Sequence, residues 1–177
     1  MTTINMIPLD SVKHKNLRIN VDRNYSHVSN QNMTPLLASE FIPASTNFPI
    51  VFVKQQETGK FKSVGLLGLD AGENLVFANN KVQSNYIPVN IRRYPFAAGG
   101  KVADESEMIL CIDENSALLN EKEGVQIFDE TGKPSGATEQ VTKLLTDILA
   151  KDAATDIFIA FLVERFITAS RSYTQAW

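Results

Sequence analysis

Two adjacent arginines, Arg92 and Arg93, stand in the segment NYIPVNIRRYPF among tyrosines, prolines and large apolar side chains. A guanidinium carries five N–H donors in a planar fork, which suits carboxylates and the carbonyl groups of a peptide. If the segment is extended, alternation sends Arg92 and Arg93 to opposite faces, and Tyr86 and Asn90 share the face of Arg92. The pattern therefore predicts that one arginine makes an internal contact and that the other is presented outward.

Acidic partners for these arginines are predicted at two positions. Glu40 lies in the apolar segment LLASEFIP, where burial of an isolated carboxylate is costly unless it is paired. Glu73 lies in the turn DAGEN. The structural interpretation is an ion pair that joins one arginine to Glu40 or Glu73. The functional interpretation is a binding site for a peptide, another protein or a saccharide, because Tyr and Arg are enriched at contact centres. Its predicted residues are Tyr86, Asn90, Arg92, Arg93 and Tyr94.

Catalytic and cofactor motifs are missing from the sequence. The glycines of GLLGLDAGEN match neither of the glycine-rich phosphate-binding patterns, and no serine stands in G-x-S-x-G. Cys111, the only cysteine, lies in the apolar run EMILCID, which indicates a buried, inert thiol. His14 and His27 have no third ligand at the spacing of a metal site. We therefore expect no metal and no cofactor, and we favour a binding protein. The alternative is an enzyme whose carboxylates and arginines meet only in the fold.

Composition restricts the class of protein further. The 177 residues are 44% hydrophobic and 21% charged, which suits one globular domain with a core. The formal net charge of −3 does not fit a nucleic-acid-binding protein. The first twenty residues contain no apolar stretch typical of a signal peptide, and no apolar run reaches the roughly 20 residues of a membrane-spanning helix. The default expectation is a soluble cytoplasmic protein.

The elements that must position these residues change character along the chain. Residues 1–34 are polar and rich in turn formers, which predicts an N-terminal arm, and residues 35–177 are expected to form a single domain. Helical periodicity predicts helices at 137–151 and 155–170. Strands are predicted at 48–54, 61–69, 75–77, 107–113 and the start of 124–136. Strands followed by helices indicate an α+β fold, with a mostly antiparallel sheet followed by two C-terminal helices.

The second predicted helix is apolar around most of its circumference. Burial of each large apolar side chain on it is favoured by about 1.5–3 kcal/mol, so leaving several in water favours association. We expect residues 155–170 to contact a partner or a second copy of the chain. The alternative is that the N-terminal arm folds back over this helix. The side chains concerned are Phe158, Phe161, Leu162, Phe166 and Ile167.

Several blocks of sequence resemble, in order and spacing, successive motifs of the SapC family of bacterial proteins. They are ASEFIPASTNFPIVFVK, VGLLGLDAGENLVF, YIPVNIRRYPF, LCIDENSALL and GVQIFDETGKPS, and the resemblance covers roughly residues 35–170. The family is named after a member linked to a bacterial surface layer. The resemblance implies a soluble accessory or binding protein of undefined biochemical role. It also implies a link to the bacterial cell surface, the surface layer or carbohydrate uptake.

Overall fold

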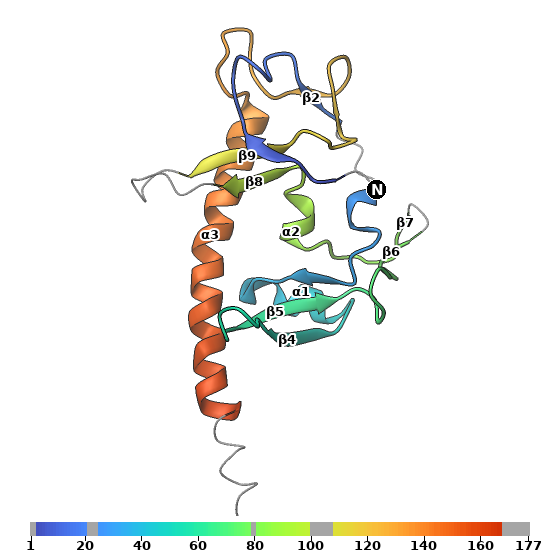
Figure 1. Ribbon diagram of the computed structural model, residues 1–177, viewed down its shortest axis with the longest axis vertical. Coiled ribbons are helices and arrows are strands. Elements are labelled where there is room, and N and C mark those ends of the chain that lie inside the picture. Colours follow the sequence, from blue (N-terminus) through green and yellow to red (C-terminus); the bar gives the residue numbers. More distant parts are fainter. Residues whose placement is uncertain (1–2, 21–24, 79–80, 100–107, 168–177) are drawn as a thin grey trace, which may run out of the picture. The chain divides into compact units, whose positions relative to one another are not determined.

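The computed structural model describes residues 3–20, 25–78, 81–99 and 108–167 (Figure 1). The chain divides into two compact units. Unit 1 comprises Met1–Asn24 and Arg93–Asp147, and unit 2 comprises Tyr25–Arg92 and Ile148–Trp177. Each unit is therefore assembled from two separate stretches of the sequence.

Unit 1 contains two small antiparallel sheets. In the first, the central strand β9 (Ile109–Asp113) pairs with β1 (Met6–Pro8) and β8 (Phe96–Gly99). In the second, β2 (Arg18–Ile19) pairs with β10 (Leu119–Asn120) and β11 (Val125–Gln126). Cys111 on β9 is buried, and burial raises the pKa of its thiol, as expected for an inert cysteine.

Part of the predicted N-terminal arm belongs to these sheets. Strands β1 and β2 both come from residues 1–34, and Ile19 on β2 is buried. Each of these strands has only two or three residues, which is too short for an alternation of apolar and polar side chains to be recognised. The polar composition of residues 1–34 therefore does not reveal the strands that form there.

Unit 2 contains a three-stranded antiparallel sheet in the order β3–β5–β4. Its strands are β3 (Met33–Pro35), β4 (Ile50–Lys54) and β5 (Phe61–Leu66). The strands predicted at 48–54 and 61–69 correspond to β4 and β5, which form a hairpin. A separate pair is formed by β6 (Phe77–Ala78) and β7 (Lys81–Val82). Short helices connect the strands: η1 (Ser26–Val28), η2 (Ala38–Glu40), α1 (Phe41–Ser45) and α2 (Val89–Arg92).

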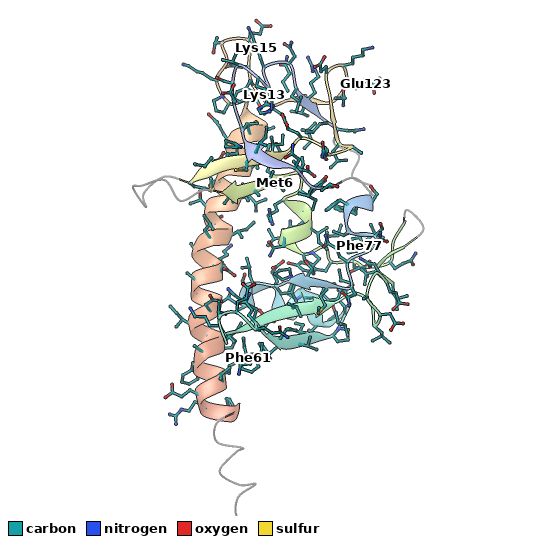
Figure 2. All side chains as sticks on the ribbon, viewed as in Figure 1. Met6, Lys13, Lys15, Phe61, Phe77 and Glu123 are labelled. Atoms are coloured by element: carbon teal, nitrogen blue, oxygen red, sulfur yellow. The ribbon has the colours of Figure 1, made fainter. Side chains whose placement is uncertain are left out.

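The core of unit 2 lies between its sheet and its short helices. Figure 2 labels Phe77, one of the buried aromatic side chains of this core. Gly65 on β5 faces it, and a Cβ there would lie 2.6 Å from the ring of Phe48. A glycine at this position is therefore required by close packing. The buried cluster consists of Val28, Leu36, Ala44, Phe48, Leu67, Phe77 and Ile91.

Helix α3 (Gly136–Leu162) is continuous where the sequence predicts two helices, and a π-helical turn at Val163–Ile167 follows it. The predicted division between 137–151 and 155–170 is therefore wrong. Thr155 Oγ1 donates to the carbonyl of Lys151 at 2.7 Å and accepts the N–H of Ala38 at 2.9 Å. Asp152 forms an ion pair with Lys62 at 3.4 Å. Both residues thus make contacts within unit 2 and do not end a helix.

The predicted fold class is confirmed: antiparallel strands precede a long C-terminal helix, and the class is α+β. The strands are antiparallel as predicted, but within the described ranges they form four small sheets where the sequence predicts one sheet. No helix in these ranges combines the length and the apolar character that crossing a membrane requires.

Candidate functional site

The segment that carries the predicted arginines is helical where an extended chain was expected. Helix α2 follows Pro88, whose carbonyl accepts the N–H groups of Ile91 and Arg92 at 2.9 and 3.0 Å. Proline suits the first turn of a helix because its φ is fixed and it has no N–H to satisfy. The strand alternation that placed Arg92 and Arg93 on opposite faces is therefore wrong.

The residues predicted to form one binding site are divided between the two units. Tyr86, Asn90 and Arg92 belong to unit 2, and Arg93 and Tyr94 belong to unit 1. Each tyrosine is bonded to a buried carboxylate of its own unit.

Glu40 is the buried carboxylate of unit 2, with 5% of its surface exposed. Its Oε1 accepts the hydroxyl of Tyr86 at 2.7 Å and the N–H of Val89 at 2.8 Å, and its Oε2 accepts the N–H of Leu37 at 2.9 Å. The bond to Val89 supplies an acceptor for the first turn of α2. Glu40 therefore fixes the ring of Tyr86 and the start of α2 together, and this contact was not foreseen from the sequence.

Tyr86 is a hydrogen-bond donor in this arrangement. Burial raises the pKa of its phenol, the bond to Glu40 adds to the rise, and nearby Arg92 opposes it. The phenol therefore keeps its proton at neutral pH and is a poor general base or nucleophile. Asn90 Nδ2 donates to the carbonyl of Pro35 at 3.2 Å, while Arg92 is exposed.

Asp113 is the corresponding buried carboxylate of unit 1, with 2% of its surface exposed. Its Oδ1 accepts the N–H groups of Asn5 at 2.8 Å and Asn115 at 3.2 Å, and its Oδ2 accepts the hydroxyl of Tyr94 at 2.8 Å. Burial raises the pKa of Tyr94 as well. The sequence signal for Asp113 is only its place at the end of an apolar strand, because its partner Asn5 is 108 residues away.

Arg93 and Glu73 make local contacts. Arg93 Nη1 donates to the carbonyl of Phe96 at 2.9 Å, and burial lowers the pKa of this guanidinium. Glu73 Oε2 accepts the N–H groups of Leu69 at 2.8 Å and Asp70 at 3.3 Å within its own turn. The ion pair that joins an arginine to Glu40 or Glu73 stays a prediction.

His14 of unit 1 is buried and is bonded at both ring nitrogens. Nδ1 accepts the N–H of Asp10 at 2.9 Å, and Nε2 lies 3.2 Å from Oε1 of Glu114. Because Nδ1 accepts, the ring proton is on Nε2 and is donated to Glu114. Lys13 and His14 together lower the pKa of Glu114. With both nitrogens occupied, His14 has a structural role. Within the described residues, no group of three or more His, Cys, Asp or Glu side chains is arranged to hold a metal ion.

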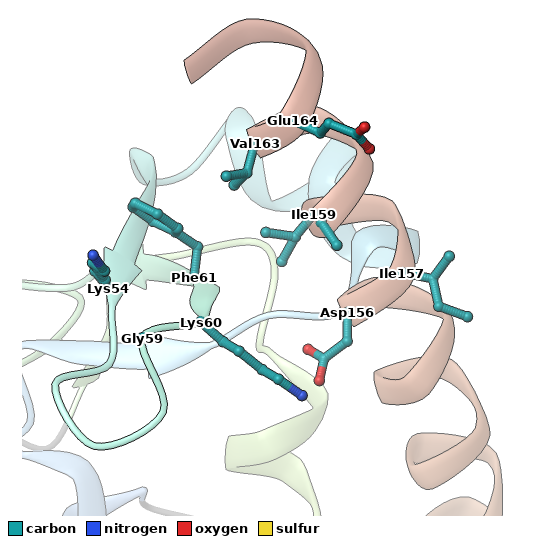
Figure 3. Close-up of a pocket in the computed structure, with 10 residues that line it drawn as sticks. Lys54, Gly59, Lys60, Phe61, Asp156, Ile157, Ile159, Val163 and Glu164 are labelled. Carbon is teal, nitrogen blue, oxygen red and sulfur yellow. The ribbon is translucent and has the colours of Figure 1, made fainter. Parts of the chain in front are cut away.

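An open groove of about 680 Å³ lies in unit 2, between the end of the β4–β5 hairpin and the C-terminal part of α3 (Figure 3). Phe61 on the hairpin faces Ile159 and Val163 on the helical side in this view, and Ile157 points away. Ile159 is 1% exposed, so the groove floor is part of the packed contact between hairpin and helix. The interior of the groove is therefore mainly apolar.

Charged side chains of opposite sign border the groove. Lys54 and Lys60 lie on the hairpin side and Asp156 lies on the helical side, where the carboxylate of Glu164 points away from the hairpin in this view. Asp156 Oδ1 also accepts a bond from Lys62 Nζ at 2.5 Å, which ties the helix to β5. The groove thus offers an apolar interior between a basic and an acidic border.

The C-terminal part of α3 and the π-helical turn after it also expose aromatic residues of the segment predicted to associate. Phe158, Phe161 and Phe166 are between 42% and 67% exposed, and Leu162 is half-buried. The side chain of Ile167 and residues 168–170 lie outside the described set. The strands of the N-terminal arm, β1 and β2, pair within unit 1. Association through 155–170 stays a prediction.

The SapC family model matches residues 9–172 of the 177-residue chain. The chain belongs to the SapC family. The resemblance found in the sequence blocks is thereby confirmed. No curated protein and no solved structure matches this SapC-family chain.

Proposed function

We propose that this SapC-family chain is a protein-binding module without catalytic activity, and that the groove of unit 2 receives an amphipathic helix of a partner protein. The observation that carries the proposal is the apolar groove with a basic and an acidic border. A link to the bacterial cell surface, the surface layer or carbohydrate uptake is suggested by the family resemblance and stays a prediction.

The lining of the groove favours a peptide over a saccharide. Sugar hydroxyls need polar side chains inside the site, whereas Phe61, Ile159 and Val163 supply an apolar interior. An amphipathic helix places apolar side chains along one face and can carry charges of both signs beside them. Such a helix would complement both borders of the groove.

The bonding of the polar residues supports binding over catalysis. The oxygens of Glu40 accept three hydrogen bonds, the phenol of Tyr86 keeps its proton, and both nitrogens of His14 are occupied. A general base needs a free lone pair within reach of a substrate proton. The exposed guanidinium of Arg92 is a second proposed contact point within unit 2.

Selection from a display library of helical peptides tests the proposal, with the full chain as the target. Ala160 is exposed and lines the groove, so Ala160→Arg should fill it and weaken binding of selected peptides at least about tenfold. The matched control is Ala153→Arg, on an exposed position of α3 outside the groove lining. Failure to enrich peptides, or equal binding by both variants, would contradict the groove as the contact site.

A further inference from the structure

Strand β4 of unit 2 leaves one of its edges open. It is the outer strand of the β3–β5–β4 sheet, and within the described residues no strand pairs with its other side (Figure 1). An edge strand presents N–H and C=O groups that can pair with another chain. The five residues of β4 are therefore a place where a further strand can be added.

The pairing with β5 shows which groups face that open edge. Gln55 N–H donates to the carbonyl of Lys60 at 2.8 Å, and Leu66 N–H donates to that of Pro49 at 2.9 Å. In an antiparallel ladder the hydrogen-bonded pairs recur at every second residue. The odd-numbered residues of β4 thus bond to β5. The even-numbered residues direct their N–H and C=O groups outward: Ile50, Phe52 and Lys54.

The opposite edge of the same sheet is blocked. Strand β3 has only three residues and ends in Pro35, which has no N–H to donate. The carbonyl of Pro35 is already bonded to Asn90. β4 contains no proline and no bulge in its pairing with β5, and its only charged residue is the terminal Lys54. Of the two edges, only that of β4 lacks such protection.

The side chains of β4 add an apolar surface to this edge. Phe52 and Val53 are 42% and 38% exposed. The ring of Phe52 packs on Phe41, with centroids 6.4 Å apart, and Phe41 packs in turn on Phe158 at 6.4 Å. A strand added beside β4 would extend this row of aromatic rings and cover Phe52.

We infer that β4 pairs with β4 of a second copy of this chain, antiparallel and centred on Phe52. Phe52 then lies opposite Phe52 of the second copy, and Ile50 lies opposite Lys54. This register uses all three outward residues of each strand and forms about six hydrogen bonds. The two sheets become one continuous six-stranded sheet.

The distribution of charge supports this register. The two Lys54 side chains lie at opposite ends of the paired strands, roughly 14 Å apart along the strand direction. That separation exceeds the Debye length of about 8–10 Å at physiological salt, so their repulsion is screened. A register shifted to place Lys54 opposite Lys54 brings two like charges together and leaves Ile50 unpaired.

A proline substitution tests the pairing. Phe52→Pro removes an outward N–H and leaves the bonds to β5 in place, since proline is tolerated at an edge position that faces solvent. Phe52→Ala is the control, because it removes the same ring and keeps the N–H. Sedimentation equilibrium of the full chain should show a dimer, and Phe52→Pro should raise its dissociation constant at least about tenfold above that of Phe52→Ala. Ala160→Arg should leave the dimer unchanged, which separates this inference from the proposed groove.

Amide hydrogen exchange of the natural chain supplies a second measurement that does not depend on a variant folding. The amides of Ile50, Phe52 and Lys54 should become protected only as the protein concentration rises, while those of Val51 and Val53 should be protected throughout. The inference would be overturned if the chain stayed a monomer at all concentrations, or if Phe52→Pro and Phe52→Ala had equal dissociation constants. It would also be overturned if the exchange rates of the outward amides did not change with concentration.

Discussion

The buried carboxylates of the two units, Glu40 and Asp113, are satisfied in the same way by different parts of the chain. Each accepts one tyrosine hydroxyl and two backbone N–H groups. The most distant partner of Glu40 is 49 residues away, whereas Asp113 holds Asn5, 108 residues away. Tyr86 and Tyr94 come from one short segment, yet each is bonded to the carboxylate of its own unit. The comparison shows that two peptide N–H groups and a phenol recur as hydrogen-bond donors to a buried carboxylate in both units.

The largest expected effect comes from removing either carboxylate. Asp113→Ala should lower the free energy of unfolding by about 4 kcal/mol and Glu40→Ala by about 3 kcal/mol, because each leaves three donors without their acceptor. Asp113 is expected to cost more since it also holds the N-terminal strand to β9. Urea denaturation of both variants measures the difference. Losses below about 1 kcal/mol would show that water replaces the carboxylates as acceptors. The similar bonding of Glu40 and Asp113 would then contribute little to stability.

The next effect separates the tyrosines from the carboxylates. Tyr86→Phe and Tyr94→Phe should each lower the free energy of unfolding by about 1.5 kcal/mol, because a hydrogen bond to a charged group is lost while the ring still packs. A double-mutant cycle of Tyr86→Phe with Glu40→Gln isolates the bond in unit 2. Additive effects in that cycle would contradict a direct contribution of the Tyr86–Glu40 bond.

Removal of each of the two arginines should change the free energy of unfolding by a different amount. Arg93→Ala should lower the free energy of unfolding by about 1 kcal/mol, because its guanidinium is partly buried and bonded to the carbonyl of Phe96. Arg92→Ala should change it by less than about 0.5 kcal/mol, as expected for an exposed side chain. Thermal and urea denaturation would both report the order, and a larger loss for Arg92 would indicate that this residue, which lies near Tyr86, has a structural role.

The smallest effect is confined to high pH. Because the pKa values of Tyr86 and Tyr94 are raised, the folded protein holds both phenolic protons more tightly than the unfolded chain does. This stabilisation is complete below the unfolded pKa of about 10 and is lost as the pH rises from there towards the folded pKa values. The free energy of unfolding, measured from pH 9 to 11.5, should therefore fall more steeply in the natural chain than in either Phe variant. Tyr86→Phe should reduce the pH dependence of the free energy of unfolding more than Tyr94→Phe does. Identical slopes in the natural chain and the two variants would contradict this account.

The sequence predicts features whose determinants are local. The hairpin of β4 and β5, strand β9 and the first half of α3 follow from apolar runs, turn glycines and helical periodicity. Helix α2 was missed because the acceptor for Val89 is Glu40, which is distant in sequence. The predicted break in α3 is wrong for a similar reason. Thr155 accepts the N–H of Ala38, and Asp152 forms an ion pair with Lys62, and both partners are distant in sequence.

The candidate site was less predictable than the fold. Its residues were selected by type and by nearness in sequence, and neither shows that Arg92 and Arg93 belong to different units. The groove residues Phe61, Ile159 and Val163 carry no motif, because an apolar side chain in a groove looks the same in the sequence as one in a core. Periodicity identified the apolar character of 155–170, but the hairpin that faces it comes from a distant part of the chain.

The order in which unit 2 is made follows from its two stretches of sequence. Residues 25–92 leave the ribosome early with β3, β4 and β5, while Ile148–Leu162 of α3 is synthesised only after both stretches of unit 1. Until then Lys62 lacks Asp152 and Asp156, and the groove lacks its helical side. A partner that binds the groove can therefore recognise only chains in which Glu164 has been synthesised, so binding would distinguish these chains from shorter nascent chains.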